Sequence, residues 1–94
     1  ALYIKDIIRC EADSSYTTLF LQNGHKIVVA KQLKEFDETL SSDGFMRVHQ
    51  SHLINLNHLF YYQKGTNLVI MNDESSIPVS AKKKEELLTF IASK

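Results

Sequence analysis

Residues 45–59, FMRVHQSHLINLNHL, break the pattern of a plain β-strand. Extended backbone is expected for residues 45–49, but polar side chains then interrupt the apolar ones: Arg47, His49, Gln50, Ser51, His52 and Asn55. Buried polar groups need hydrogen-bond partners, so this density indicates either an internal network or a surface that displays polar groups. The residues alone leave both interpretations open.

The sequence before this segment predicts short antiparallel strands. Residues 4–12 are rich in β-branched side chains. Residues 16–22 and 25–30 are joined by Asn23-Gly24, the favoured pair for a two-residue type I′ turn. Leu19 and Leu21 fall on one face of the strand at residues 16–22, and Tyr16 and Phe20 fall on the other. Bulky side chains on both faces predict that this strand is covered on both sides.

The sequence after the segment predicts a second group of strands. Residues 59–63 are expected to pair with residues 67–71 across a glycine-containing turn. A last short strand is expected at residues 76–79. Pro78 cannot donate a backbone hydrogen bond there, which favours an edge position.

Two helices complete the predicted fold. Leu33, Phe36 and Leu40 follow the spacing of one helical stripe. Residues 81–93 form the second predicted helix, with Ser80 as its N-cap. The fold class is therefore expected to be mainly β: short antiparallel sheets with one inserted helix and a C-terminal helix, in one domain over residues 1–94.

The composition sets limits on the class of protein. With 44% hydrophobic and 23% charged residues it is ordinary for a globular domain, and no apolar run approaches the length of a membrane span. The start at Ala1 suggests a domain from a longer protein. Cys10, the only cysteine, lies in an apolar run and is expected to be a core residue. A single free cysteine is compatible with the cytoplasm.

The residues offer no support for catalysis, metal binding or a cofactor. His49, His52 and His58 fall within ten residues, but positions three apart in a strand point to opposite faces. Ser51 has no nucleophile motif around it, and Cys10 has no adjacent base. We therefore predict a protein that is not an enzyme, with no catalytic or metal-ligating residues and no cofactor.

Lys82, Lys83 and Lys84 allow two interpretations. They fall in the first turn of the predicted C-terminal helix, where the helix dipole is already positive. They are either a solvated face, with Lys82 and Glu86 four residues apart, or an anion site that combines lysines with free backbone N–H groups. Eleven basic and eleven acidic residues balance, so DNA affinity would depend on how the charges are arranged.

Residues 45–56, FMRVHQSHLINL, resemble the central signature of the LytTR DNA-binding domain, Phe-x-Arg-(apolar)-His-x-Ser-x-(apolar)-(apolar)-Asn. Two more motifs agree in order: YTTL at residues 16–19 after an acidic stretch, and IPVS at residues 77–80 before the terminal helix. The predicted helix at residues 33–40 also matches, so the resemblance covers essentially the whole chain.

The resemblance implies a function. Members of this family bind double-stranded DNA through loops in successive major grooves and regulate transcription. They are usually cytoplasmic output domains of two-component response regulators, behind a receiver domain that an upstream sensor kinase phosphorylates. They typically bind direct repeats as dimers. A protein-interaction module that kept the fold without DNA binding is the alternative.

The resemblance also implies which residues contact DNA. The family's contact positions correspond here to three places: Ser14, Ser15 and Tyr16; Gln50; and Ser80, Ala81 and Lys82. Arg47 and Lys83 are added because their charged side chains suit phosphates. Gln50 suits bidentate pairing with adenine, whereas Arg47, Lys82 and Lys83 suit phosphates. His49, Ser51 and Asn55 are expected to brace the loop that presents Gln50.

Two positions depart from the family pattern. Many members carry Arg where this chain has Gln50 and Ala81. Losing these two cations predicts fewer phosphate contacts and a shallower salt dependence of DNA binding than a more basic relative would show.

Overall fold

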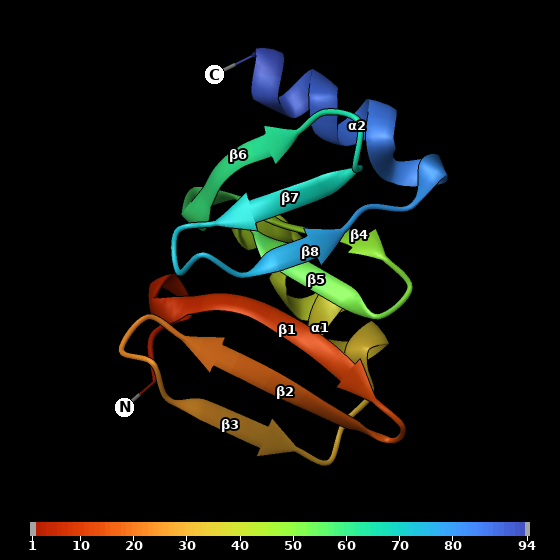
Figure 1. The fold of residues 1–94 in the computed structure, drawn as a ribbon. Coiled ribbons are helices and arrows are strands. Elements are labelled where there is room, and N and C mark those ends of the chain that lie inside the picture. The colour runs from red at the N-terminus through yellow and green to blue at the C-terminus, as the bar shows by residue number, and fades with distance from the viewer. Residues whose placement is uncertain (1, 94) are drawn as a thin grey trace.

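The computed structural model describes residues 2–93 and contains two antiparallel sheets and two α-helices (Figure 1). The larger sheet has the strand order β3-β2-β1-β5-β4, and its strands are β1 (Ile7–Asp13), β2 (Tyr16–Leu21), β3 (Lys26–Val29), β4 (Phe45–His49) and β5 (His52–Asn55). The smaller sheet has the order β6-β7-β8, with β6 (Leu59–Gln63), β7 (Leu68–Met71) and β8 (Ser76–Pro78). The helices are α1 (Leu33–Leu40) and α2 (Ala81–Ala92). This confirms the predicted mainly β fold with one inserted and one C-terminal helix.

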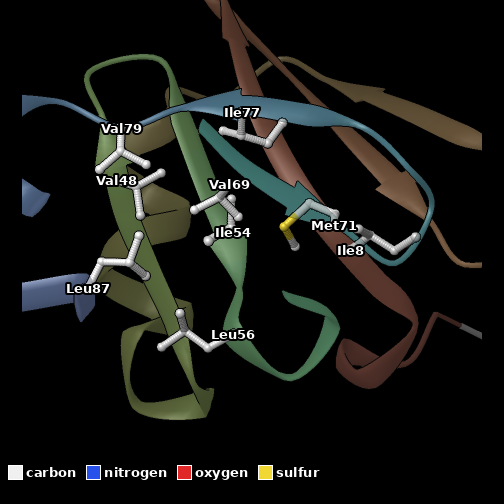
Figure 2. Packing of buried hydrophobic residues seen from close by; sticks show 9 residues of the cluster. All are labelled: Ile8, Val48, Ile54, Leu56, Val69, Met71, Ile77, Val79 and Leu87. Atoms are coloured by element: carbon white, nitrogen blue, oxygen red, sulfur yellow. The ribbon is translucent and has the colours of Figure 1, made fainter. Parts of the chain in front are cut away.

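The first hydrophobic core lies between the two sheets and α2 (Figure 2). Both sheets contribute to it, and its buried members are Ile8, Val48, Ile54, Leu56, Val69, Met71, Ile77, Val79 and Leu87. Leu87 is the fully buried residue of α2 and fixes that helix against β4.

The second core lies between the five-stranded sheet and α1, with the buried members Ile7, Cys10, Leu19, Leu33, Leu40, Phe45 and Leu53. Successive side chains of a strand point to opposite faces, so Leu53 enters this core while its neighbour Ile54 enters the first. Cys10 is a core residue as predicted, and burial raises the pKa of its thiol to about 12.

The N-terminal strand begins later than its β-branched residues predicted. Ile4–Asp6 form a 3₁₀ turn, and only then does β1 start, at Ile7. The backbone N–H of Gln22 donates to the carbonyl of Asp6 at 2.8 Å, so this turn docks onto the loop between β2 and β3. A tertiary contact therefore outweighs the local strand preference.

The loop between β2 and β3 also differs from its prediction. Gly24 has a positive φ of 89°, but Asn23 is not among the described residues with positive φ, as a type I′ turn would require. The Leu21 N–H donates to the carbonyl of His25 at 2.9 Å, which leaves a three-residue loop. A glycine in the left-handed conformation at the end of such a loop is its usual form.

Strand β2 is buried on one face only, contrary to the prediction that both faces are covered. Thr17 and Leu19 are buried, whereas Tyr16 is 51% exposed. Phe20 on the Tyr16 face is covered by a side chain instead of a second layer: the Arg9 guanidinium lies 3.7 Å from the centre of its ring.

The fold predicts how α2 is held. Leu87→Ala should lower the free energy of unfolding by about 2–5 kcal/mol, because it removes a fully buried side chain and leaves a cavity in the first core. Thr89→Ala, at an exposed position of the same helix, is the matched control and should change stability by less than about 0.5 kcal/mol. Urea unfolding followed by circular dichroism measures both, and equal effects would contradict this account of the core.

Candidate nucleic-acid interface

Three connections lie at the same end of the molecule, on the right in Figure 1: the β1–β2 turn, the β4–β5 turn and the junction between β8 and α2. Two backbone hydrogen bonds hold them together. The Ala12 N–H donates to the carbonyl of Ser51 at 2.9 Å, and the Ser80 N–H donates to the carbonyl of Val48 at 2.8 Å. Segments far apart in sequence thus form one continuous edge.

An open cleft separates the β4–β5 turn from the start of α2. It is lined by seven residues: Arg47, His49, Gln50, Ser80, Lys82, Lys83 and Glu86. Five of these were predicted as DNA contacts from the sequence. Ser14, Ser15 and Tyr16 lie at the neighbouring β1–β2 turn, outside the cleft, and Ala81 is exposed at the first residue of α2. The structure therefore brings all nine predicted residues to one end of the molecule, and five of them into one cleft.

The segment of residues 49–52, where the resemblance implied a loop that presents Gln50, is a tight hairpin. His49 pairs with His52, so Gln50 and Ser51 form a two-residue turn between β4 and β5. The Arg47 Nη2 donates to the carbonyl of Gln50 at 2.6 Å, and the Ser51 N–H donates to Nδ1 of His49 at 3.0 Å. These bonds fix the backbone of the turn and leave residue Gln50 exposed to solvent.

Asn55 does not brace this turn, contrary to the prediction. It is buried at the far end of β5, where its Nδ2 donates to the carbonyl of Ile7 at 3.0 Å and its Oδ1 accepts from the Asn57 N–H at 3.0 Å. Asn55 therefore joins β5 to the start of β1.

The start of α2 presents the second side of the cleft. Ser80 is the N-cap residue as predicted, but its side chain makes no capping hydrogen bond. Lys82 is exposed, and the N-terminal N–H groups of a helix favour anions. Glu86 pairs with Lys83, with 3.4 Å between Nζ and Oε1, in place of the predicted pair with Lys82. Glu86 also lines the cleft and was not predicted as a site residue, although its i, i+3 spacing from Lys83 placed both on one helix face.

The β1–β2 turn is exposed and has a defined conformation. Ser14 adopts a positive φ of 55° between the paired residues Asp13 and Tyr16. Both serines are exposed, and Tyr16 is 51% exposed. The turn thus offers two hydroxyl groups and an aromatic ring beside the cleft, together with the carboxylate of Asp13.

The net charge is zero, but the positive and negative side chains are partly separated on the surface. The cleft carries three cations, Arg47, Lys82 and Lys83, against the carboxylate of Glu86. The turn between β7 and β8, at the opposite end of the molecule in Figure 1, carries Asp73 and Glu74, and further acidic residues lie on α1. A chain with no net charge can in this way present a locally positive cleft.

His49 and His52 are cross-strand neighbours and do not lie on opposite faces as the spacing suggested. Their ring centres are 5.3 Å apart, because the hairpin turn reverses the chain between them. His58 lies elsewhere, with its Nε2 2.7 Å from the carbonyl oxygen of Lys5. Within residues 2–93, no three His, Cys, Asp or Glu side chains are grouped as a metal site would need.

Burial lowers the pKa of His52 from its ordinary value of 6.5. The carboxylate of Glu11, with Oε1 3.9 Å from Nδ1, opposes this shift, whereas His49 and Arg9 add to it. His52 is therefore a neutral group at neutral pH, 15% exposed, at the base of the β4–β5 turn.

This shift predicts how stability depends on pH. The unfolded chain binds the His52 proton more tightly than the folded one does. The contribution of His52 to the free energy of unfolding is therefore fully present above about pH 6.5 and is lost as the pH falls below it. His52→Gln should flatten the decrease in free energy of unfolding between about pH 7 and about pH 5. Glu11→Gln should steepen it, because the carboxylate that favours protonation is lost. Urea unfolding across this range measures both, and a His52→Gln profile identical to that of the parent would refute the assignment.

Comparison with known proteins identifies the family and the fold. A model of the family LytTR, the LytTr DNA-binding domain, matches residues 1–92. The fold is similar to the LytTr DNA-binding domain of a Bacillus cereus protein described as a methyl-accepting/DNA response regulator. The TM-score is 0.82 at 22% sequence identity, covering 96% of this chain and 84% of the other.

Two curated relatives are transcriptional regulators of Paraburkholderia xenovorans (strain LB400). The heme-containing CO-sensing transcriptional regulator RcoM 1 is 29% identical over 90 residues, which cover 92% of this chain and 33% of that protein. The corresponding RcoM 2 is 28% identical over 88 residues, which cover 89% of this chain and 33% of that protein. The chain thus spans one third of the length of either relative.

No helix among the described residues is long and apolar enough to cross a membrane. The family model covers nearly the whole chain, and the fold agrees with that of a solved domain of the same family. The chain therefore belongs to the LytTr DNA-binding domain family.

Proposed function

We propose that this domain binds specific double-stranded DNA sequences to regulate transcription. The observation that carries the proposal is the cleft in which an exposed amide, Gln50, faces the lysine-bearing start of α2. An amide side chain and helix N-terminal cations are complementary to the two parts of duplex DNA, base edges and phosphates. The family membership and the regulatory role of both curated relatives support the same function.

In this proposal Gln50 enters the major groove and pairs with N6 and N7 of adenine. The bond from Arg47 to the Gln50 carbonyl and the bond from the Ser51 N–H to His49 hold the turn in one conformation before DNA arrives, so little conformational entropy is lost on binding. Lys82 and Lys83 contact phosphates beside the N-terminal N–H groups of α2. The Arg47 guanidinium keeps further N–H donors after its bond to the Gln50 carbonyl, and these can bind phosphates of the same DNA duplex.

The β1–β2 turn supplies a second contact region in this proposal. Ser14 and Ser15 are exposed hydroxyl donors, and Tyr16 is an exposed ring at the same edge. Hydroxyl groups suit phosphate and sugar oxygens, which set the orientation of the protein on the duplex.

The larger context is also proposed. The domain acts as the output part of a longer cytoplasmic regulator, in which a receiver domain responds to a sensor kinase. Two copies bind direct repeats in DNA. Both curated relatives are three times as long as the matched region, which supports a multidomain arrangement.

One observation favours the alternative of a protein-interaction module. Phe60 and Tyr61 on β6 are 67% and 45% exposed, with ring centres 5.2 Å apart. Exposed aromatic side chains are enriched in protein interfaces. A domain of this kind would associate with a protein and show no salt-dependent retention on DNA.

Selection from a randomised duplex pool at low salt tests the proposal, followed by anisotropy titrations on the enriched sequence. Gln50→Ala should remove about 1–3 kcal/mol of preference for the contacted base pair and leave binding to unrelated duplexes unchanged. Gln22→Ala, at an exposed position in the β2–β3 loop at the opposite end of the sheet, is its control. A pool that yields no enriched motif would refute sequence-specific binding.

Lys82→Ala should act differently from Gln50→Ala. Removing one phosphate contact should weaken all duplexes equally and reduce the slope of log K against log salt by about 0.9. Lys34→Ala, exposed on α1, should leave the slope unchanged. If Lys34→Ala and Lys82→Ala had equal effects, the phosphate contact would not be at α2.

A further inference from the structure

The three consecutive lysines at the start of α2 are not equivalent. The Nζ of Lys83 lies 3.4 Å from Oε1 of Glu86, whereas Lys82 and Lys84 form no salt bridge with any carboxylate in residues 2–93. The Lys83 and Glu86 side chains are 42% and 60% exposed, so water reaches both partners. Exposed pairs of this kind contribute little to stability, and they exchange partners readily.

The location of this pair matters more than its strength. Lys83 and Glu86 both line the cleft that holds Arg47 and Gln50, and Glu86 is the one carboxylate among the seven described residues of its wall. Its neighbour Glu85 is also exposed on α2 but does not line the cleft. The chain therefore places a negative group where the proposed function requires the negative backbone of DNA.

We propose that Glu86 is an internal competitor of DNA: in the free domain its carboxylate occupies Lys83 in place of a phosphate oxygen. This inference rests on the proposed function. When DNA enters the cleft, Lys83 must exchange the carboxylate for a phosphate, and Glu86 remains nearby as a repulsive charge. The electrostatic affinity, which is the same for every sequence, is thereby held down, while the base contact from Gln50 is unaffected.

The competition would weaken binding to DNA of any sequence and leave the ratio of specific to non-specific affinity unchanged, because the Lys83 contact is common to both. A carboxylate in the cleft limits that binding without removing the lysine. It also adds to the effect of Gln50 and Ala81, the two positions at which cations common in the family are missing.

A charge-matched pair of variants tests this inference. Glu86→Gln and Glu85→Gln remove the same charge from adjacent positions of one helix, and both side chains are exposed, so folding should be retained. In anisotropy titrations with a duplex of unrelated sequence, Glu86→Gln should bind about threefold tighter than the parent. Its slope of log K against log salt should be steeper by about 0.9, because Lys83 becomes a full phosphate ligand. Glu85→Gln should show only a small part of either effect.

A double-mutant cycle assigns the effect to Lys83. In a Lys83→Gln background, Glu86→Gln should tighten binding no more than Glu85→Gln does, because the lysine for which Glu86 competes is absent. Equal gains from Glu85→Gln and Glu86→Gln in the parent background would overturn the proposal, because net charge alone would then explain them. A gain from Glu86→Gln that persists fully without Lys83 would also overturn it.

The same titrations separate this inference from the function on which it rests. If the parent binds duplexes with a measurable salt slope and the two glutamate variants behave alike, only the role of Glu86 fails. If the parent and both variants show no salt-dependent binding at any salt concentration, DNA binding itself fails, and the competition fails with it.

Discussion

The pairing of β1 with β5 is the constraint on which the rest of the structure depends. These strands pair antiparallel, with Cys10 opposite Leu53 and Arg9 opposite Ile54. Because β5 is covered on both faces, its alternating side chains supply two cores at once, one under α1 and one against the smaller sheet. Asn55 secures the end of this pairing through its buried hydrogen bond to Ile7. The β1–β5 pairing therefore joins the first three strands to the β4–β5 hairpin in one sheet.

The same pairing places the candidate site. Because β1 runs antiparallel to β5, the end of β1 meets the beginning of β5, and the β1–β2 turn comes to lie beside the β4–β5 turn. The Ser80–Val48 hydrogen bond then brings the start of α2 to the same edge. Function in this family is expected at loops, and here three loops are held by a scaffold whose strand β5 is buried on both faces.

The electrostatics of the cleft follow from local placement of charge rather than from composition. Lys82, Lys83 and Arg47 converge on the cleft, but Arg47 already bonds to the turn and Lys83 to Glu86. Lys82 therefore carries the least compensated charge at this edge. A domain built in this way would depend on base contacts for a larger share of its affinity than one with a strongly basic face.

The sequence by itself determined the family and most of the elements, because turn residues, helical spacing and a contiguous signature are local properties of the chain. It also predicted Gln50, Lys82 and Lys83 as site residues, and the structure brings these three into one cleft. Only the tertiary structure decided the late start of β1 and the role of Asn55. It likewise decided the pairing of His49 with His52 and of Lys83 with Glu86. These depend on chain reversal, strand pairing and side-chain rotamers, which bring groups together or keep them apart irrespective of their spacing in sequence.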